Sequence, residues 1–152
     1  GVDPRRSERL PEVSELHRPK ALGQVLPHSD FVVVTVPQTP ETQGMFAATQ
    51  FRQMKSSAFF INVGRGATVV LDDLVEALQN GEIAGAGLDV YQVEPLPSNH
   101  PLWTTPGVLM TPHMAGNGPH SDQRREDLFI ENCRRFNEGQ DLRNVVDKAP
   151  WF

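Results

Sequence analysis

The feature of the sequence that most constrains the fold is the alternation of short apolar runs with helical patterns. Asp30 to Val36 contains four consecutive apolar residues, and the stretches 57–63, 83–90 and 108–111 have a similar character. Continuous apolar runs of this length are typical of strands buried on both faces, as in parallel sheets. We therefore predict an α/β fold with four parallel strands near residues 31–36, 58–63, 84–90 and 108–111.

Two segments carry the spacing of amphipathic helices. Four apolar residues recur at i, i+3, i+4 and i+7 and so share one helical face: Leu71, Leu74, Val75 and Leu78. A second helix is predicted from about His120 to Glu138, with Phe129, Cys133 and Phe136 on its inner face. Strands that alternate with helices pair in parallel through right-handed crossovers, which supports the predicted sheet.

Composition narrows the classes of partner and compartment. The chain has 152 residues, a net charge of −5 and no cluster of lysine and arginine without nearby acids. Nucleic acids and anionic membranes require a positive footprint, so neither is an expected partner. The longest apolar runs have the length of strands, and no signal peptide is visible. The single Cys133 cannot form an internal disulfide, and a reducing cytoplasm is the expected compartment.

Charged residues follow the predicted strands, where ligands bind in parallel sheets. Arg65 lies between Gly64 and Gly66 after the second strand, in a loop whose backbone could approach a ligand closely. Its guanidinium could hold a carboxylate through two hydrogen bonds. A surface arginine in a flexible turn is an equally good interpretation of this motif taken alone.

Three further ionisable residues follow the third and fourth strands. Asp89 interrupts an apolar strand end, where a buried carboxylate needs partners, and Glu94 lies in the next loop. His113 follows the fourth strand and is suited to proton transfer at neutral pH. A solvated loop acid and a structural histidine are the alternatives for Glu94 and His113. Together with Arg65, a His–Glu pair suits the reduction of a 2-oxo acid, with a hydride taken from a cofactor.

The glycine fingerprint of a dinucleotide-binding loop is absent from the sequence. Gly85-Ala86-Gly87 has the beginning of that pattern, but it lies inside the third predicted strand. The fingerprint requires a strand, a glycine-rich turn and a helix in succession. No metal site is predicted.

Six motifs, taken in this order, resemble the D-isomer-specific 2-hydroxyacid dehydrogenase family. They are Asp30–Val34, Val36–Thr42, Asn62–Gly66, Gly85–Val90, Glu94–Pro97 and Thr111–His113, and the resemblance extends from Gly1 to about Asp147. It implies a partial, Rossmann-type, doubly wound parallel sheet that lacks its first strand and glycine-rich loop. Residues 1–118 would form a partial NAD(P)-binding domain. Residues 119–152 would form a C-terminal helix and a tail that returns toward a substrate domain outside this sequence.

The resemblance also implies roles for individual residues. Arg65 resembles the arginine that anchors the substrate, His113 the general acid/base, and Glu94 the acid that pairs with this histidine. Glu94 argues against formate dehydrogenases, in which glutamine occupies this position. Asp89 resembles the residue that meets the nicotinamide end of the cofactor. The other residues expected to border the cofactor are Val36, Pro37, Thr42, Val63, Gly64, Arg65 and Gly116.

The first residues bear on the choice between NAD and NADP. Gly1–Arg6 resembles the end of the second strand of the dinucleotide fold, where an acid, here Asp3, would bind the ribose hydroxyls. This slightly favours NAD. Arg5 and Arg6 could instead meet a 2′-phosphate, which leaves NADP open. The alternative is a frayed, charged terminus.

The resulting functional hypothesis is an oxidoreductase that transfers a hydride between NAD(P)H and a small 2-oxo acid of the glyoxylate or hydroxypyruvate type. The complete protein is expected to be a homodimer. One alternative is an NAD(H)-sensing corepressor similar to the C-terminal-binding proteins, which keep a similar arginine, glutamate and histidine. The other alternative is a catalytically inert fragment.

Overall fold

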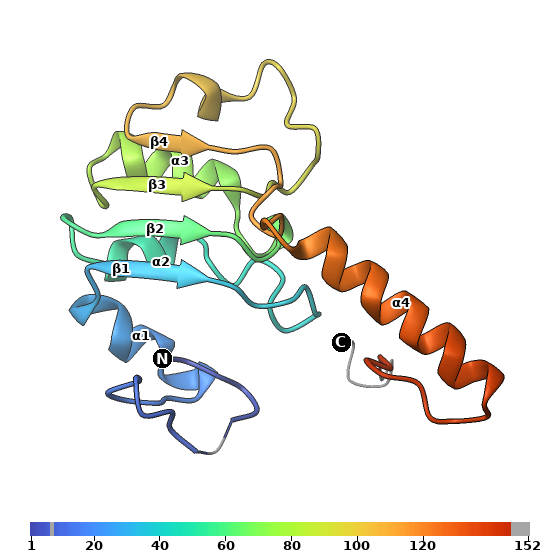
Figure 1. Ribbon diagram of the computed structural model, residues 1–152. Coiled ribbons are helices and arrows are strands. Elements are labelled where there is room, and N and C mark those ends of the chain that lie inside the picture. Colours follow the sequence, from blue (N-terminus) through green and yellow to red (C-terminus); the bar gives the residue numbers. More distant parts are fainter. Residues whose placement is uncertain (7, 147–152) are drawn as a thin grey trace. The chain divides into compact units, whose positions relative to one another are not determined.

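The computed structural model describes residues 1–6 and 8–146 (Figure 1). The chain divides into two compact units, Gly1–Met110 and Thr111–Phe152, and each is described by itself below. The functional division predicted after residue 118 falls within the second unit and stays a prediction. Asp147, the last residue of the resemblance, lies outside the described residues.

A four-stranded parallel sheet forms the centre of the first unit. Its strands are β1 (Phe31–Val34), β2 (Phe59–Asn62), β3 (Gly85–Leu88) and β4 (Val108–Met110), in the spatial order β1-β2-β3-β4 (Figure 1). Val32 pairs with Phe60, Phe60 with Ala86, and Ala86 with Val108. The four predicted parallel strands are therefore confirmed, and all their carboxyl ends meet at one edge of the sheet.

Helices connect the strands. The first unit contains α1 (Leu22–Val25), α2 (Ala48–Gln53) and α3 (Leu71–Gln79), with 3₁₀ turns η1 (Pro19–Ala21), η2 (Leu26–His28), η3 (Gly66–Thr68) and η4 (Pro101–Thr104). The spacing in α3 predicted its buried face, because Leu71, Leu74 and Val75 are buried. Asp73, in the first turn of α3, accepts the Ala48 N–H at 2.8 Å and thereby caps the start of α2.

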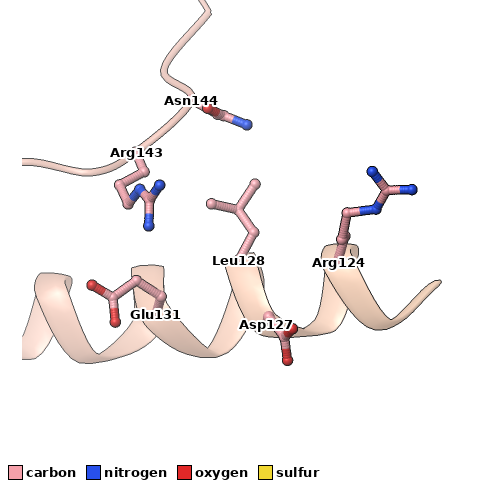
Figure 2. A pocket seen from close by; sticks show the side chains of 6 residues that line it. All are labelled: Arg124, Asp127, Leu128, Glu131, Arg143 and Asn144. Carbon is pink, nitrogen blue, oxygen red and sulfur yellow. The ribbon is translucent and has the colours of Figure 1, made fainter. Parts of the chain in front are cut away.

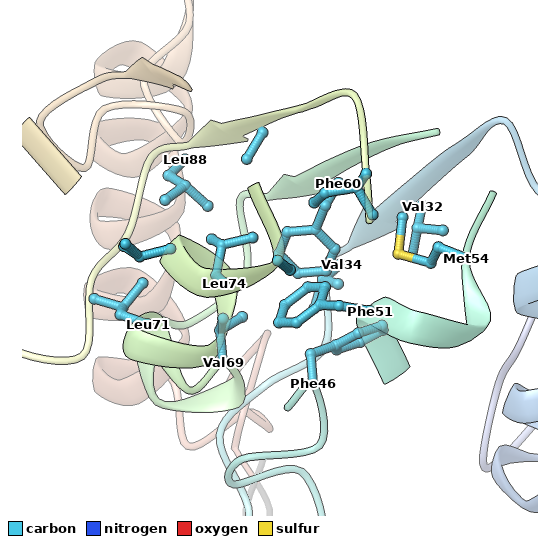
Figure 3. Packing of buried hydrophobic residues seen from close by; sticks show 14 of the residues in the cluster. Val32, Val34, Phe46, Phe51, Met54, Phe60, Val69, Leu71, Leu74 and Leu88 are labelled. Carbon is cyan, nitrogen blue, oxygen red and sulfur yellow. The ribbon is translucent and has the colours of Figure 1, made fainter. Parts of the chain in front are cut away.

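The hydrophobic core lies between one face of the sheet and the helices α2 and α3 (Figure 3). Phe51 of α2 meets Phe60 of β2 edge to face, with ring centroids 5.2 Å apart. Phe46 packs against the same Phe60 ring at 5.0 Å. Each buried aromatic side chain of this kind contributes about 1.5–3 kcal/mol to folding. The aromatic cluster therefore fixes β2, and with it the loop that follows β2.

The opposite face of β1 and β2 is uncovered, which corrects the prediction of strands buried on both faces. Phe31 is 65% exposed, Val33 55% and Phe59 43%. The Phe31 and Phe59 rings stack on each other at 5.8 Å. The reason is that α2 and α3 pack only against the side chains of the other face, which include Val32, Val34 and Phe60.

The first residues of the chain form a separate, minimal strand pair. Val2 and His17 make a parallel bridge, in which the Asp3 N–H donates to the His17 carbonyl at 3.1 Å. The His17 N–H donates to the Gly1 carbonyl at 2.9 Å. This parallel bridge agrees with the interpretation of Gly1–Arg6 as a strand end.

The second unit consists of α4 (Ser121–Asn137) and a tail that folds back on it. The predicted helix is present, but its predicted inner face is wrong. Phe129 is 70% exposed and Phe136 78%, and Cys133 is exposed. Nothing among the described residues of this unit covers that side of α4.

The tail is held by Asn132, whose side chain accepts the Arg143 N–H at 2.8 Å and donates to the Arg143 carbonyl at 3.1 Å. Helix and tail enclose a shallow pocket (Figure 2), which is lined by Arg124, Asp127, Leu128, Glu131, Arg143 and Asn144. Hydrogen bonds from Arg135 and Arg134 lower the pKa of Glu131. The pocket contains none of the site residues predicted from the sequence.

No helix in the described part of the chain is long and apolar enough to cross a membrane.

Candidate functional site

The loop after β2 is held by two buried side chains, those of Asn62 and Thr68. Asn62, the last residue of β2, is 1% exposed. Its Oδ1 accepts the Gly64 N–H at 3.0 Å, and its Nδ2 donates to the Arg65 carbonyl at 3.1 Å. The buried Thr68 hydroxyl donates to the same carbonyl at 2.7 Å. The backbone around Arg65 is therefore fixed by side chains that do not reach the surface.

The two glycines of this loop pack against the neighbouring strand-end loops. A Cβ atom at Gly66 would lie 1.9 Å from the carbonyl carbon of Tyr91, and one at Gly64 would lie 2.8 Å from the Val36 carbonyl oxygen. Such distances exclude any side chain. We expected these glycines to allow a close approach to a ligand, whereas in the structure they allow the backbone to contact the loops on both sides. The loops after β1, β2 and β3 thus form one packed layer.

Arg65 itself projects out of this layer. It is exposed and lies between two buried glycines, with an extended backbone (φ −142°, ψ 137°). Its Nη1 donates to the Gly64 carbonyl at 2.8 Å. The arginine is therefore the solvent-facing charge at the centre of the layer, as a residue that captures an anionic ligand must be.

The loop after β1 is shaped by Thr42. Its hydroxyl donates to the Pro37 carbonyl at 2.8 Å and accepts the Thr39 N–H at 2.8 Å. Val36 and Pro37 are half-buried, and a parallel bridge between Phe46 and Val69 joins the end of this loop to the segment after Arg65. The hydroxyl of Thr39 lowers the pKa of the exposed Glu41. Thr42 thus stabilises the loop through its own hydrogen bonds, and its contact with a cofactor stays a prediction.

The loop after β3 carries the two predicted acids. Asp89 is 3% exposed, as expected for the carboxylate that interrupts the strand end, and its N–H donates to the Asn62 carbonyl at 3.0 Å. The Glu94 side chain is folded back on its own loop, where Oε1 accepts the Tyr91 N–H at 2.9 Å. The Glu94–Pro95 peptide is cis. Glu94 is therefore exposed but ordered by the backbone of its loop.

Asp3 caps the turn that follows Val2. Its Oδ1 accepts the backbone N–H groups of Arg5 at 2.7 Å and Arg6 at 2.8 Å. These hydrogen bonds lower the pKa of Asp3, and the one from the Arg6 N–H has the larger effect. The side chains of Arg5 and Arg6 are exposed beyond the turn, and Arg18 donates to the Pro4 carbonyl at 2.8 Å.

His113 and Gly116 follow β4 and belong to the second unit. The His113 backbone has a φ of +50°, a conformation that side-chain-bearing residues rarely adopt. Its N–H donates to the Thr111 carbonyl at 3.2 Å, and its side chain is exposed. Strained backbone of this kind clusters at functional sites. Gly116 has open space around its Cα.

The structure thus brings together the predicted residues of three loops in the first unit: Val36, Pro37, Thr42, Val63, Gly64, Arg65, Asp89 and Glu94. Sequence reasoning missed Asn62, Thr68 and Tyr91 as the residues that build this layer. A signal for Asn62 was present, since it is a polar residue that ends an otherwise apolar strand. Among the described residues, no group of three or more histidine, cysteine or acidic side chains is placed to hold a metal ion.

A parallel α/β sheet with such loops at its carboxyl edge is the architecture of the doubly wound, Rossmann-type class, in which ligands bind at that edge. Residues 1–115 match the family described as D-isomer specific 2-hydroxyacid dehydrogenase, NAD binding domain. The chain belongs to this family.

Individual relatives agree with this assignment. Glyoxylate/hydroxypyruvate reductase B of Salmonella newport (strain SL254) is 50% identical over 126 residues, which are 83% of this chain and 39% of that protein. A solved D-isomer specific 2-hydroxyacid dehydrogenase family protein from Aeromonas salmonicida has a TM-score of 0.86 at 35% identity, over 97% of this chain and 46% of that one. The NADPH-dependent glyoxylate/hydroxypyruvate reductase of Sinorhizobium meliloti, solved with NADP and sulfate, has a TM-score of 0.84 at 36% identity. The match covers 98% of this chain and 48% of the Sinorhizobium protein. This chain therefore spans less than half the length of each of these relatives.

Proposed function

We propose that this chain supplies the NAD(P)-binding and acid/base half of an enzyme that reduces a small 2-oxo acid, of the glyoxylate or hydroxypyruvate type. The observation that carries the proposal is Arg65, an exposed guanidinium on a rigid loop at the carboxyl edge of the sheet. The names of the relatives support the same substrate class. We propose that the enzyme acts in the cytoplasm and that the full-length protein forms a homodimer.

The proposed roles follow from the chemistry of each group. Arg65 binds the carboxylate of the substrate and orients the adjacent carbonyl, because a guanidinium matches a carboxylate with two parallel hydrogen bonds. His113 donates the proton that the carbonyl oxygen takes up, and Glu94 is its proposed acidic partner, which orients the ring. The nicotinamide, when bound, supplies the hydride. These roles need no metal.

The residues of this chain fit part of a dinucleotide. The loop residues after β1, β2 and β3, with Asp89 buried behind them, are suited to border a nicotinamide and its ribose. The sequence has no glycine-rich loop to cradle the pyrophosphate with backbone N–H groups. In a doubly wound sheet, the strand before that loop lies in the middle of the sheet. Here its place would be between the strand that contains Val2, which pairs with His17, and the open edge of β1. We propose that a segment of the full-length enzyme outside these residues fills this place.

Replacing Arg65 with alanine tests the proposed function. The full-length Arg65→Ala enzyme should have a KM for glyoxylate or hydroxypyruvate raised about 10- to 100-fold, because a hydrogen bond to a charged group contributes about 1.5–3 kcal/mol. The loss in kcat should be smaller and should come from misorientation. Arg52→Ala, which removes an arginine from the last turn of α2, is the matched control and should leave KM unchanged. An unchanged KM in Arg65→Ala would reject the role of Arg65. Cofactor binding by the parent without any turnover would favour the sensor alternative.

The structure gives a reason to favour NADP over NAD, against the slight preference taken from the sequence. Asp3 was the reason to favour NAD, but Oδ1 of its carboxylate accepts two backbone N–H groups of its own turn. Beyond that turn two exposed arginines offer charge to a 2′-phosphate. We therefore propose NADP(H) as the cofactor.

The double variant Arg5→Ala/Arg6→Ala tests this preference. The ratio of kcat/KM with NADPH to that with NADH should fall at least about tenfold, since charge-assisted hydrogen bonds to the phosphate are lost. Arg9→Ala is the matched control, because Arg9 lies in the same segment and donates to the Val13 carbonyl. If the double variant keeps the ratio of the parent enzyme, the arginines do not read the 2′-phosphate.

A further inference from the structure

We propose that Asn62 is a positioning residue for the substrate-binding arginine. This inference rests on the proposed function, because it gives Asn62 its importance through Arg65. The amide of Asn62 spans two residues of the loop, since Oδ1 accepts the Gly64 N–H and Nδ2 donates to the Arg65 carbonyl. A single side chain thus sets the peptide planes on both sides of the Gly64–Arg65 pair.

Burial makes this arrangement rigid. Asn62 is 1% exposed and Thr68 is fully buried, so water does not replace their hydrogen bonds to the loop. Nδ2 of Asn62 also donates to the Thr68 hydroxyl at 3.3 Å, and that hydroxyl donates to the Arg65 carbonyl. Asn62 and Thr68 therefore act as one unit. The strand pairing of Asn62 with Val34 and Leu88 anchors that unit in the middle of the sheet.

The glycine contacts restrict the motion of the loop. The loop is in backbone contact with Val36 on one side and Tyr91 on the other, so sideways motion is blocked. Asn62 holds the peptides on either side of the Gly64–Arg65 pair through its two hydrogen bonds. A misdirected guanidinium would still be charged, but it would no longer present both donors in the plane of a bound carboxylate.

Asn62→Asp and Thr68→Val test the inference in the full-length enzyme. Aspartate keeps the acceptor for the Gly64 N–H but places an oxygen opposite the Arg65 carbonyl. Valine keeps the shape of threonine without its hydroxyl. We expect each variant to raise the KM for the 2-oxo acid about tenfold, with a smaller change in kcat. In an Arg65→Ala background, Asn62→Asp should change KM less than twofold, because coupled residues are not additive.

Thr105→Val separates positioning from general stability. Thr105 is also buried, and its hydroxyl also donates to a backbone carbonyl, that of Pro101 at 3.0 Å, but it lies before β4 and away from the Arg65 loop. The Thr105→Val variant should lower the melting temperature about as much as Thr68→Val does, without changing the KM for the 2-oxo acid. Amide hydrogen exchange should rise over residues 62–69 in Asn62→Asp and Thr68→Val and stay at the parent level there in Thr105→Val.

A KM within twofold of the parent in Asn62→Asp overturns the inference, as does an effect that multiplies fully with that of Arg65→Ala. Unchanged hydrogen exchange over residues 62–69 also overturns it, since Asn62 then does not hold the loop. An unchanged KM in Arg65→Ala alone rejects the proposed function instead, and the exchange measurement still decides whether Asn62 fixes the loop.

Discussion

Replacing His113 is expected to lower kcat of the full-length enzyme by roughly 10²–10⁴, the usual contribution of a general acid–base group. The expectation comes from its place after β4, at the carboxyl end of a strand, and from its strained backbone with a φ of +50°. A residue held in that conformation is maintained by its surroundings at some cost, which suits a side chain whose direction matters. Steady-state kinetics with a 2-oxo acid and NAD(P)H measure the effect.

The choice of variant matters because alanine disturbs both the chemistry and the backbone. Asparagine adopts positive φ more readily than alanine, so His113→Asn removes the imidazole while it keeps the local conformation. Both variants should lose kcat to the same extent, and KM for the 2-oxo acid should change little. His120→Ala is the matched control, since His120 belongs to the same unit and its side chain does not cap α4. If His113→Asn keeps kcat within threefold of the parent, His113 is not the proton donor.

Gly66→Ala is expected to be the most destabilising single substitution among those considered. The added methyl group would lie 1.9 Å from the carbonyl carbon and oxygen of Tyr91, which are backbone atoms that cannot rotate away. The loops after β2 and β3 must separate to accommodate it, and the free energy of unfolding should fall by about 3 kcal/mol or more. Denaturant titration of the full-length enzyme measures this loss.

A glycine within the sheet, Gly87 of β3, provides the comparison. A Cβ atom at Gly87 would meet only the Ile61 side chain, at 3.7 Å, which is an ordinary contact distance. Gly87→Ala should therefore change the free energy of unfolding by less than about 1 kcal/mol, in either direction. Equal effects of the two substitutions would show that the contact between Gly66 and Tyr91 does not govern stability.

The sequence predicted the sheet well because apolar runs report burial directly. The runs that contain Val32, Phe60 and Ala86 are strands in the structure with these residues buried in the core, and the spacing in α3 identified its buried face. The same logic failed for Phe31, Val33 and Phe129. Their hydrophobicity correctly indicates that something should cover them, but a pattern within one chain does not say whether the cover lies within that chain.

The candidate site was predicted in part. The positions of Arg65, Asp89 and Glu94 followed from the rule that loops at the carboxyl ends of parallel strands carry function. The contacts of Gly64 and Gly66 could not be predicted, because they depend on the distance between loops that are far apart in the sequence. Asp3 illustrates a different limit. An acid after a strand can bind a ligand or cap the following turn, and the hydrogen bonds from the Arg5 and Arg6 N–H groups show that Oδ1 of Asp3 caps its turn.

The edge of β1 has a consequence for residues 1–152 as a separate polypeptide. β1 is the first strand of the sheet order, and among the described residues only β2 pairs with it, while Phe31 and Val33 on its outer face are exposed. Open strand edges flanked by apolar side chains are templates on which further chains add by backbone pairing. A cell that made these residues alone would face an assembly hazard that depends on concentration, and chaperones and proteases would compete with fibre growth for the product.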